Sequence, residues 1–238
     1  MDAIHGKVIL ITGGTKGIGL GVAQALINEG AKVAVTGRSE NGAVEALRIL
    51  QQLKRGEVMS IVADVRKADD LHRAVSAIVS KWGKLDVLVA NAGVGHFSSI
   101  EELTEEQWNE TIDTNLTGVF FSIKSSLAEL KKSKGYIITM ASLAGTNFFA
   151  GASAYNASKF GLVGFTQAVM LDVRRAGIKV TTIMPGSVAT NFDNHTPTAD
   201  DAWKIQPEDI GQIVIDLLKM NPRALPSKIE VRPTIPKG

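Results

Sequence analysis

Apolar residues recur along the chain in short, nearly continuous runs separated by longer stretches of helical periodicity. The runs are rich in Val, Ile and Leu and predict strands at residues 7–12, 32–37, 58–63, 85–90, 135–141, 179–184 and 228–232. Because nearly every position in them is apolar, we expect strands that are buried on both faces. The intervening patterns predict helices at residues 17–29, 40–54, 67–82, 104–132, 153–176 and 207–220.

Strand and helix therefore alternate along the whole chain, which predicts an α/β fold. Right-handed crossovers turn this order into one doubly wound, Rossmann-type sheet of about seven parallel strands, with helices on both faces. In such a sheet the ligand binds at the carboxyl ends of the strands. Because we find no linker, internal repeat or low-complexity segment, we predict a single domain over residues 1–238.

Composition narrows the class of protein. The formal charge of +2 comes from 26 basic and 24 acidic residues, and no clustered basic face predicts a nucleic-acid partner. The absence of cysteine excludes disulfides and thiolate chemistry and is consistent with a reducing compartment. The first apolar run is too short for a signal peptide or membrane span, so we expect a soluble, cytoplasmic protein.

A glycine-rich turn, TGGTKGIG at residues 12–19, follows the first predicted strand and opens the first predicted helix. Glycines at 13, 17 and 19 allow a tight turn in which backbone N–H groups approach a pyrophosphate at the helix N-terminus. Taken alone, such a turn is as often structural. Its position between strand and helix favours a nucleotide site.

The end of the second strand discriminates between cofactors. NAD sites usually place an acidic residue there for the ribose 2′-OH, but this chain reads VTGRS, with Arg38 and no acid until Glu40. Arg38 can pair with a 2′-phosphate, and Lys16 can add a second positive charge. The alternative is that both are ordinary surface cations. We predict NADP(H) over NAD(H).

Other strand ends contribute polar or small residues to the same edge. Asp64 follows the third strand, Asn91 and Gly93 follow the fourth, and Ser142 follows the fifth. Each would be an ordinary turn residue if taken singly. No cluster of His, Asp and Glu implies a required metal.

Tyr155 and Lys159 are four residues apart on one predicted helix and therefore share a helix face. A free phenol has a pKa of about 10, which a nearby ammonium should lower toward the range useful for acid–base catalysis. Ser142 could hold a carbonyl beside the phenol while a reduced nicotinamide delivers hydride. The pair alone is more often a chance occurrence, but a nucleotide site at the same edge favours catalysis.

Taken together, TGGTKGIG, NAG at 91–93, Asn115, Ser142, YNASK at 155–159 and PG at 185–186 resemble the classical short-chain dehydrogenases/reductases, in order and spacing over essentially the whole chain. The resemblance implies a catalytic tetrad of Asn115, Ser142, Tyr155 and Lys159. It implies that the asparagine holds a water linked to the lysine, and that the lysine also binds the nicotinamide ribose. With the glycine turn it implies cofactor contacts at Thr12, Gly13, Thr15, Lys16, Gly17, Ile18, Gly19, Arg38, Asp64, Val65, Asn91, Ala92, Gly93, Tyr155, Lys159, Pro185, Gly186, Val188 and Thr190.

The resemblance also suggests a substrate pocket that is mostly apolar. Its candidates are His96, Phe97, Ala144, Phe148, Phe149, Gly186, Phe192 and His195, with Ser142, Phe97, Phe148 and Tyr155 as the predicted substrate contacts. The two histidines are more often polar loop residues. The ending EVRPTIPKG departs from the glycine-rich ending of tetrameric members, so we expect a homodimer formed through the two long helices, with a tetramer or a monomer as alternatives.

Three classes of function remain open, and the first of them includes a sharper alternative. We favour an NADP(H)-dependent enzyme that interconverts a small-molecule carbonyl and a secondary alcohol. A 3-oxoacyl thioester reductase is a sharper alternative, and an acidic carrier protein would need a basic rim, for which Arg174, Arg175 and the lysines at 131, 132 and 134 are candidates. A non-catalytic dinucleotide-binding regulator is the alternative of another class, and a purely structural oligomer would explain the fewest residues.

Overall fold

A single seven-stranded parallel sheet organises the computed structural model, which describes residues 4–192 and 195–236. Its order is β3-β2-β1-β4-β5-β6-β7. The strands are β1 (Val8–Thr12), β2 (Lys32–Gly37), β3 (Glu57–Val62), β4 (Val87–Ala90), β5 (Tyr136–Met140), β6 (Lys179–Pro185) and β7 (Lys228–Val231). The predicted α/β fold and its strands are confirmed. The predicted domain also includes residues 1–3, 193–194 and 237–238, which lie outside the described residues, whereas every predicted site residue lies within them.

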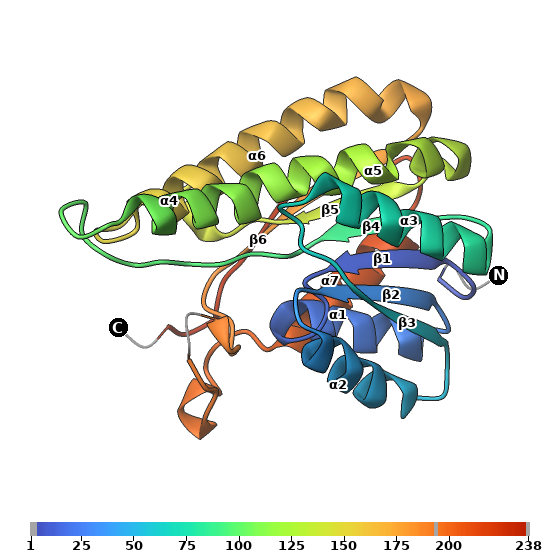
Figure 1. Cartoon of the computed structure of the whole chain (residues 1–238), viewed down its shortest axis with the longest axis horizontal. Coiled ribbons are helices and arrows are strands. Elements are labelled where there is room, and N and C mark those ends of the chain that lie inside the picture. The colour runs from blue at the N-terminus through green and yellow to red at the C-terminus, as the bar shows by residue number, and fades with distance from the viewer. Residues whose placement is uncertain (1–3, 193–194, 237–238) are drawn as a thin grey trace.

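Helices cover both faces of the sheet (Figure 1). On one face lie α1 (Gly17–Asn28), α2 (Glu40–Gln51) and α7 (Pro207–Lys219), and on the other lie α3 (Ala68–Trp82), α5 (Gly118–Ser133) and α6 (Ser153–Val173). A shorter helix, α4 (Glu105–Ile112), leads into α5. No helix among the described residues is long and apolar enough to cross a membrane.

The central strands are buried on both faces, as their continuous apolar character predicts. Along β1, Val8 and Leu10 pack into the core beneath α3, α5 and α6. Ile9 and Ile11 alternate with them and pack into the opposite core beneath α1, α2 and α7. Each strand residue therefore contributes to one of two apolar layers.

The predicted helix at 104–132 is present as an unbroken helical run, but it is not α-helical throughout. Between α4 and α5, residues Asp113–Thr117 form a π-helical turn. The buried positions Thr111, Thr114, Asn115 and Gly118 keep helical spacing through this wide turn, so the sequence pattern does not reveal it. Such turns often occur at functional sites, and this one contains Asn115.

The sheet changes winding direction between β1 and β4, because β2 and β3 extend to one side and β5, β6 and β7 to the other. A crevice at the carboxyl ends of the strands is expected at such a switch point. The glycine turn after β1 and the Asn91–Gly93 segment after β4 both lie there.

Candidate active site

The glycine turn after β1 is closely packed. Gly13 has a φ of +63°, and a Cβ at this position would lie 2.7 Å from the Cα of Ala92. Gly17 has a φ of +54°, and a Cβ on Gly19 would collide with the carbonyl oxygen of Gly13. Only glycine meets these requirements without strain, and the result is an open backbone surface at the N-terminus of α1.

Asn91 fixes this turn to the end of β4. Its Nδ2 donates to the carbonyl oxygens of Thr12 and Gly13, both at 3.0 Å. The hydroxyl of Thr12, which is 1% exposed, accepts from the backbone N–H groups of Asn91 and Ala92. The side chain of Asn91 therefore positions the turn.

The remaining predicted cofactor residues surround this surface. Thr15 packs beside Gly37 at the end of β2, and Thr190 lies next to Gly17, where a Cβ would be 3.4 Å from its side chain. Val65 is 5% exposed and packs against Gly118. Ile18 packs on the core and Lys16 is exposed.

The segment after β6 carries further predicted cofactor residues. Pro185 ends β6, and the backbone N–H of Gly186 donates to the carbonyl oxygen of Val231. Val188 forms a parallel β-bridge with Ile205.

These residues fit a dinucleotide. Cβ atoms on Gly13 and Gly19 would collide with Ala92 and with the carbonyl oxygen of Gly13, so only glycines allow the tight turn that a pyrophosphate site at a helix N-terminus needs. Beyond this turn, the end of β2 presents Arg38, which is about half exposed. The hydroxyl of Ser39 caps α2 by accepting from Gly42 N–H, and this cap fixes the backbone next to Arg38.

Arg38 already has a partner. Its Nη1 donates to Oε1 of Glu110 on α4 at 2.9 Å, and Oε2 of Glu110 lies 2.9 Å from Nε2 of His96. The hydrogen bonds from His96 and then Arg38 lower the pKa of Glu110. His96, a pocket candidate from the sequence, is thus a hydrogen-bond partner of Glu110.

Asp64 is paired as well. The guanidinium of Arg66 donates to both of its carboxylate oxygens, with Nη2 to Oδ2 at 2.6 Å. This bidentate contact lowers the pKa of Asp64. Asp70 accepts from the backbone N–H of Asp64, so the segment after β3 is held in place.

Asn115 is fully buried, and its side chain is committed to hydrogen bonds. Oδ1 accepts from Val94 N–H at 2.8 Å, while Nδ2 donates to the carbonyl of Val94 at 2.8 Å and to the hydroxyl of Ser158 at 3.0 Å. The π-helical turn directs this side chain toward the segment after β4. A Cβ on Gly93 would lie 3.3 Å from Oδ1 of Asn115 and 3.7 Å from Nζ of Lys159.

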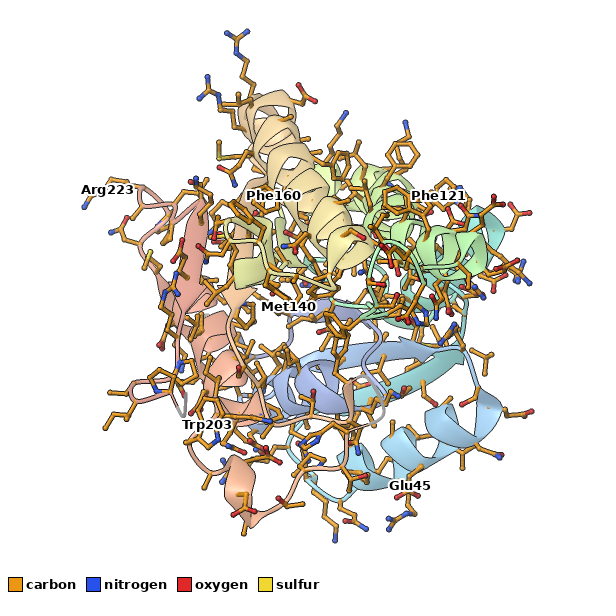
Figure 2. All side chains as sticks on the ribbon, turned by 90° about the vertical axis from the view of Figure 1, so that its left-hand side faces the viewer. Glu45, Phe121, Met140, Phe160, Trp203 and Arg223 are labelled. Carbon is orange, nitrogen blue, oxygen red and sulfur yellow. The ribbon has the colours of Figure 1, made fainter. Side chains whose placement is uncertain are left out.

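Ser142, Tyr155 and Lys159 meet at the carboxyl edge of β5. The hydroxyl of Ser142 accepts from Ala144 N–H at 3.1 Å and lies close enough to the phenol of Tyr155 to lower its pKa. Nζ of Lys159 donates to the carbonyl of Met140 at 3.0 Å and lies 5.6 Å from the centroid of the Tyr155 ring. Met140, labelled in Figure 2, lies near the centre of the molecule, below α6.

The pKa of Tyr155 differs from the sequence-based prediction. We expected Lys159 to lower it, but burial raises it, and the hydrogen bond from Ser142 offsets this only in part. Burial also lowers the pKa of Lys159 to about 8. Desolvation disfavours the charged form of each group, and it is the largest cause of both shifts.

An aromatic cluster surrounds the phenol. The ring centroids of Phe97 and Phe192 lie 5.3 Å and 5.8 Å from that of Tyr155, and Phe149 stacks on Phe97 at 6.2 Å. Phe148 is 85% exposed and has no ring contact among those of the described residues. The predicted pocket therefore gathers around Phe97, while Phe148 points to solvent.

Two further sequence-based candidates lie elsewhere. The side chain of His195 pairs with Asp201 at 2.7 Å within the segment between β6 and α7. The candidate basic rim was wrong: α5 and α6 begin near the site and end at the amino edge of the sheet, where Lys134 borders Gly177 and lines a hollow with Tyr136. Arg174 and Arg175 follow α6 to that same far edge.

Some residues of the site carry no sequence signal. Glu110 and Arg66 contact residues that approach them only in the folded chain. Asn156, which was uninformative in the sequence, donates to the carbonyls of Ala144 and Asn147 and so holds the loop after Ser142. Within residues 4–192 and 195–236, no group of three His, Cys, Asp or Glu side chains is placed to bind a metal ion.

Comparison with known proteins agrees with this geometry. The family model described as short chain dehydrogenase matches residues 7–201. An uncharacterized oxidoreductase of Staphylococcus saprophyticus is 32% identical over 238 residues, which are 98% of this chain and all of the relative. The 3-oxoacyl-[acyl-carrier-protein] reductase of Vibrio cholerae is 34% identical over 190 residues, covering 79% of this chain and 76% of the relative.

Among solved structures, the chain is similar to an alcohol dehydrogenase from the archaeon Thermococcus sibiricus, complexed with 5-hydroxy-NADP. The TM-score is 0.91 at 28% identity, and the match covers 98% of each chain.

Proposed function

The chain belongs to the short-chain dehydrogenase family, and from this we propose that it is an NADP(H)-dependent oxidoreductase that interconverts a carbonyl and a secondary alcohol. The observation that carries the proposal is the meeting of Ser142, Tyr155 and Lys159 at the strand edge that also carries the glycine turn. The glycine turn alone would suffice to bind a dinucleotide, whereas a phenol beside a hydroxyl and a buried amine also provides the groups that proton transfer requires.

When the dinucleotide is bound, its nicotinamide supplies or accepts the hydride. All other steps fall to residues of the chain. In the reductive direction, Ser142 holds the substrate oxygen beside the phenol and Tyr155 donates its proton to that oxygen. The raised pKa of Tyr155 keeps the phenol protonated at neutral pH, as a proton donor requires. The ammonium of Lys159 then stabilises the phenolate that forms.

Asn115 has a supporting role in this proposal. Its side chain ties the π-helical turn to Val94 and Ser158, and so keeps the segment after β4 against the helix that carries Tyr155 and Lys159. The family resemblance assigns the asparagine a water linked to Lys159. The proximity of Asn115 and Lys159 around Gly93 is compatible with that assignment.

The choice of NADP(H) rests on Arg38 at the end of β2 and on Lys16 in the glycine turn, with no acidic residue between Gly37 and Glu40. The archaeal alcohol dehydrogenase, similar over nearly its whole length, is complexed with an NADP derivative. Equilibrium binding of NADPH and NADH to the purified protein tests the choice. Tighter binding of NADH would overturn it.

The proposed substrate is a small or medium-sized apolar carbonyl compound. Phe97, Phe149 and Phe192 form the aromatic side of the site around Tyr155. Such a wall favours alkyl or aryl ketones over keto acids, because it offers a carboxylate no partner. Oxidation of NADPH, measured across aryl ketones, quinones, keto-sugars and 2-keto acids, tests this ranking. Fastest turnover of a keto acid would contradict it.

Reduction of a 3-oxoacyl thioester is the second candidate, and the similarity to the Vibrio cholerae reductase favours it. The cations at residues 131–134 and 174–175 lie at the opposite edge of the sheet, so a carrier protein would need another surface. Acetoacetyl thioesters therefore belong in the same assay. If they react no faster than simple ketones, this candidate is eliminated.

We also propose a homodimer formed through α5 and α6. Phe120 on α5 and Phe160 on α6 are 42% and 43% exposed, and the ring of Phe120 contacts Phe121 and Phe165. Figure 2 shows Phe121 and Phe160 on the outer helical layer. Phe160→Glu should lower the mass in light scattering from dimer to monomer. Val44→Glu, at an exposed apolar residue of α2, is the control and should not.

A further inference from the structure

Four charged side chains from separate segments meet near the end of β2. Arg38 follows β2, Asp64 and Arg66 follow β3, and Glu110 lies on α4. The ion pairs are Arg38 Nη1 to Glu110 Oε1 at 2.9 Å, Arg66 Nη2 to Asp64 Oδ2 at 2.6 Å and Arg66 Nη1 to Glu110 Oε1 at 3.8 Å. Two guanidinium groups thus face two carboxylates, and their charges balance.

Glu110 is held in this cluster from two sides. One carboxylate oxygen accepts from Arg38, and the other lies 2.9 Å from Nε2 of His96, in the segment after β4. These contacts lower the pKa of Glu110, so its carboxylate is ionised at neutral pH. An anionic oxygen therefore occupies one of the N–H positions that Arg38 could offer to a phosphate.

We propose that Glu110 is a specificity-determining residue that competes with the cofactor's 2′-phosphate for Arg38 and thereby limits the preference for NADP(H) over NAD(H). The inference rests on the proposed cofactor site. Without Glu110 the cluster would carry a net charge of +1, and the N–H donors of the Arg38 guanidinium that now bind Glu110 could bind the phosphate. With Glu110 present, the phosphate must displace a like-charged carboxylate or bind beside it.

The expected gain in phosphate affinity depends on how far Arg38 and Glu110 are exposed to solvent. The side chains of Arg38 and Glu110 are 52% and 30% exposed, so water and salt screen the pair. Exposed ion pairs contribute little to stability, and one further unit of charge near a screened phosphate has a similarly small effect. Removal of the carboxylate should therefore strengthen phosphate binding by roughly three- to tenfold.

The test uses two nucleotides that differ only in the 2′-phosphate, adenosine 2′,5′-bisphosphate and AMP. Their binding to the full chain is measured by calorimetry for the wild type, Glu110→Gln and Glu105→Gln. Glu105 lies in the first turn of the same helix and serves as a matched removal of negative charge. Glu110→Gln should bind the bisphosphate roughly three- to tenfold more tightly than the wild type, with AMP unchanged, and the gain should shrink at high salt.

The outcomes separate the inference from the proposed function. If the wild type does not prefer the bisphosphate to AMP, the NADP(H) assignment fails and the inference fails with it. If the wild type shows the preference but Glu110→Gln binds the bisphosphate equally or more weakly, only the inference is overturned. Weaker binding would show that Glu110 orients Arg38. An equal increase in bisphosphate affinity in Glu105→Gln would also contradict the inference, because the increase would then come from the lower negative charge of the helix and not from loss of the contact with Arg38.

Discussion

The ammonium of Lys159 lies 5.6 Å from the centroid of the Tyr155 ring and donates a hydrogen bond to the carbonyl of Met140. Both side chains are largely removed from water, and burial shifts the two pKa values in opposite directions, raising that of Tyr155 and lowering that of Lys159 to about 8. At neutral pH the phenol therefore holds its proton while the amine is still mostly charged.

The activity should decline at alkaline pH. Burial disfavours the ammonium, so Lys159 loses its proton near pH 8, well below the ordinary lysine value of 10.5. Once neutral, it no longer stabilises the phenolate. We expect kcat/KM for NADPH to fall about tenfold per pH unit above this pKa. The measurement is a pH–rate profile, with circular dichroism to verify the fold at each pH. A profile that stays flat to pH 10 would contradict the role of Lys159.

The same buried amine should make stability depend on pH. Below pH 8 the folded and unfolded states both bind the proton, whereas between about 8 and 10.5 only the unfolded state does. The free energy of unfolding of the wild type should thus rise with pH in this window, relative to Lys159→Met, by about 1.4 kcal/mol per pH unit. Urea unfolding at several pH values measures the difference.

Lys131→Met is the control for that series, because Lys131 is exposed on α5. The difference in free energy of unfolding between Lys131→Met and the wild type should not change across the same pH range. A parallel change in both variants would mean that the slope does not come from burial of Lys159.

The glycine turn should tolerate no side chain at Gly13. A Cβ there would lie 2.7 Å from the Cα of Ala92. Gly6 also has a positive φ, of +73°, but its Cβ would meet nothing within 4 Å. Both alanine variants should lose about 1–2 kcal/mol to the left-handed conformation. Only Gly13→Ala should also lose dinucleotide binding, which fluorescence titration with NADPH measures. Unchanged NADPH binding by Gly13→Ala would refute the pyrophosphate site at this turn.

Much of this structure can be predicted from the sequence, because strand burial and glycine spacing are local properties. The apolar runs locate the strands. The tight turn between β1 and α1 requires glycines, so their spacing in the sequence locates it as well. The π-helical turn at Asn115 within the 104–132 helix is not predictable in this way. The buried positions on the two sides of the wide turn, Thr111 and Gly118, continue the helical spacing of Thr114 and Asn115 within it.

Electrostatics is the least predictable part of the site. Arg38 in VTGRS suggests a free cation, yet Glu110, 72 residues later, is its partner. Tyr155 and Lys159 suggest mutual attraction, yet their pKa values are governed by burial, which no spacing reveals. The predicted cytoplasmic location and the absence of a nucleic-acid partner stay predictions.

The central claim is that Tyr155 donates the proton in an NADPH-dependent reduction. The chain contains only one other tyrosine, Tyr136, whose phenol hydrogen-bonds Thr181 at 2.7 Å at the start of β5, away from the site. Tyr155→Phe and Tyr136→Phe thus remove the same hydroxyl from a half-buried and a buried position.

The most direct measurement is the turnover of both variants with NADPH and the best ketone found in the screen, together with their affinity for NADPH. We predict that Tyr155→Phe loses about 10²- to 10⁴-fold in kcat and still binds NADPH, while Tyr136→Phe keeps its turnover. Wild-type turnover by Tyr155→Phe, or an equal loss in both variants, would contradict the account.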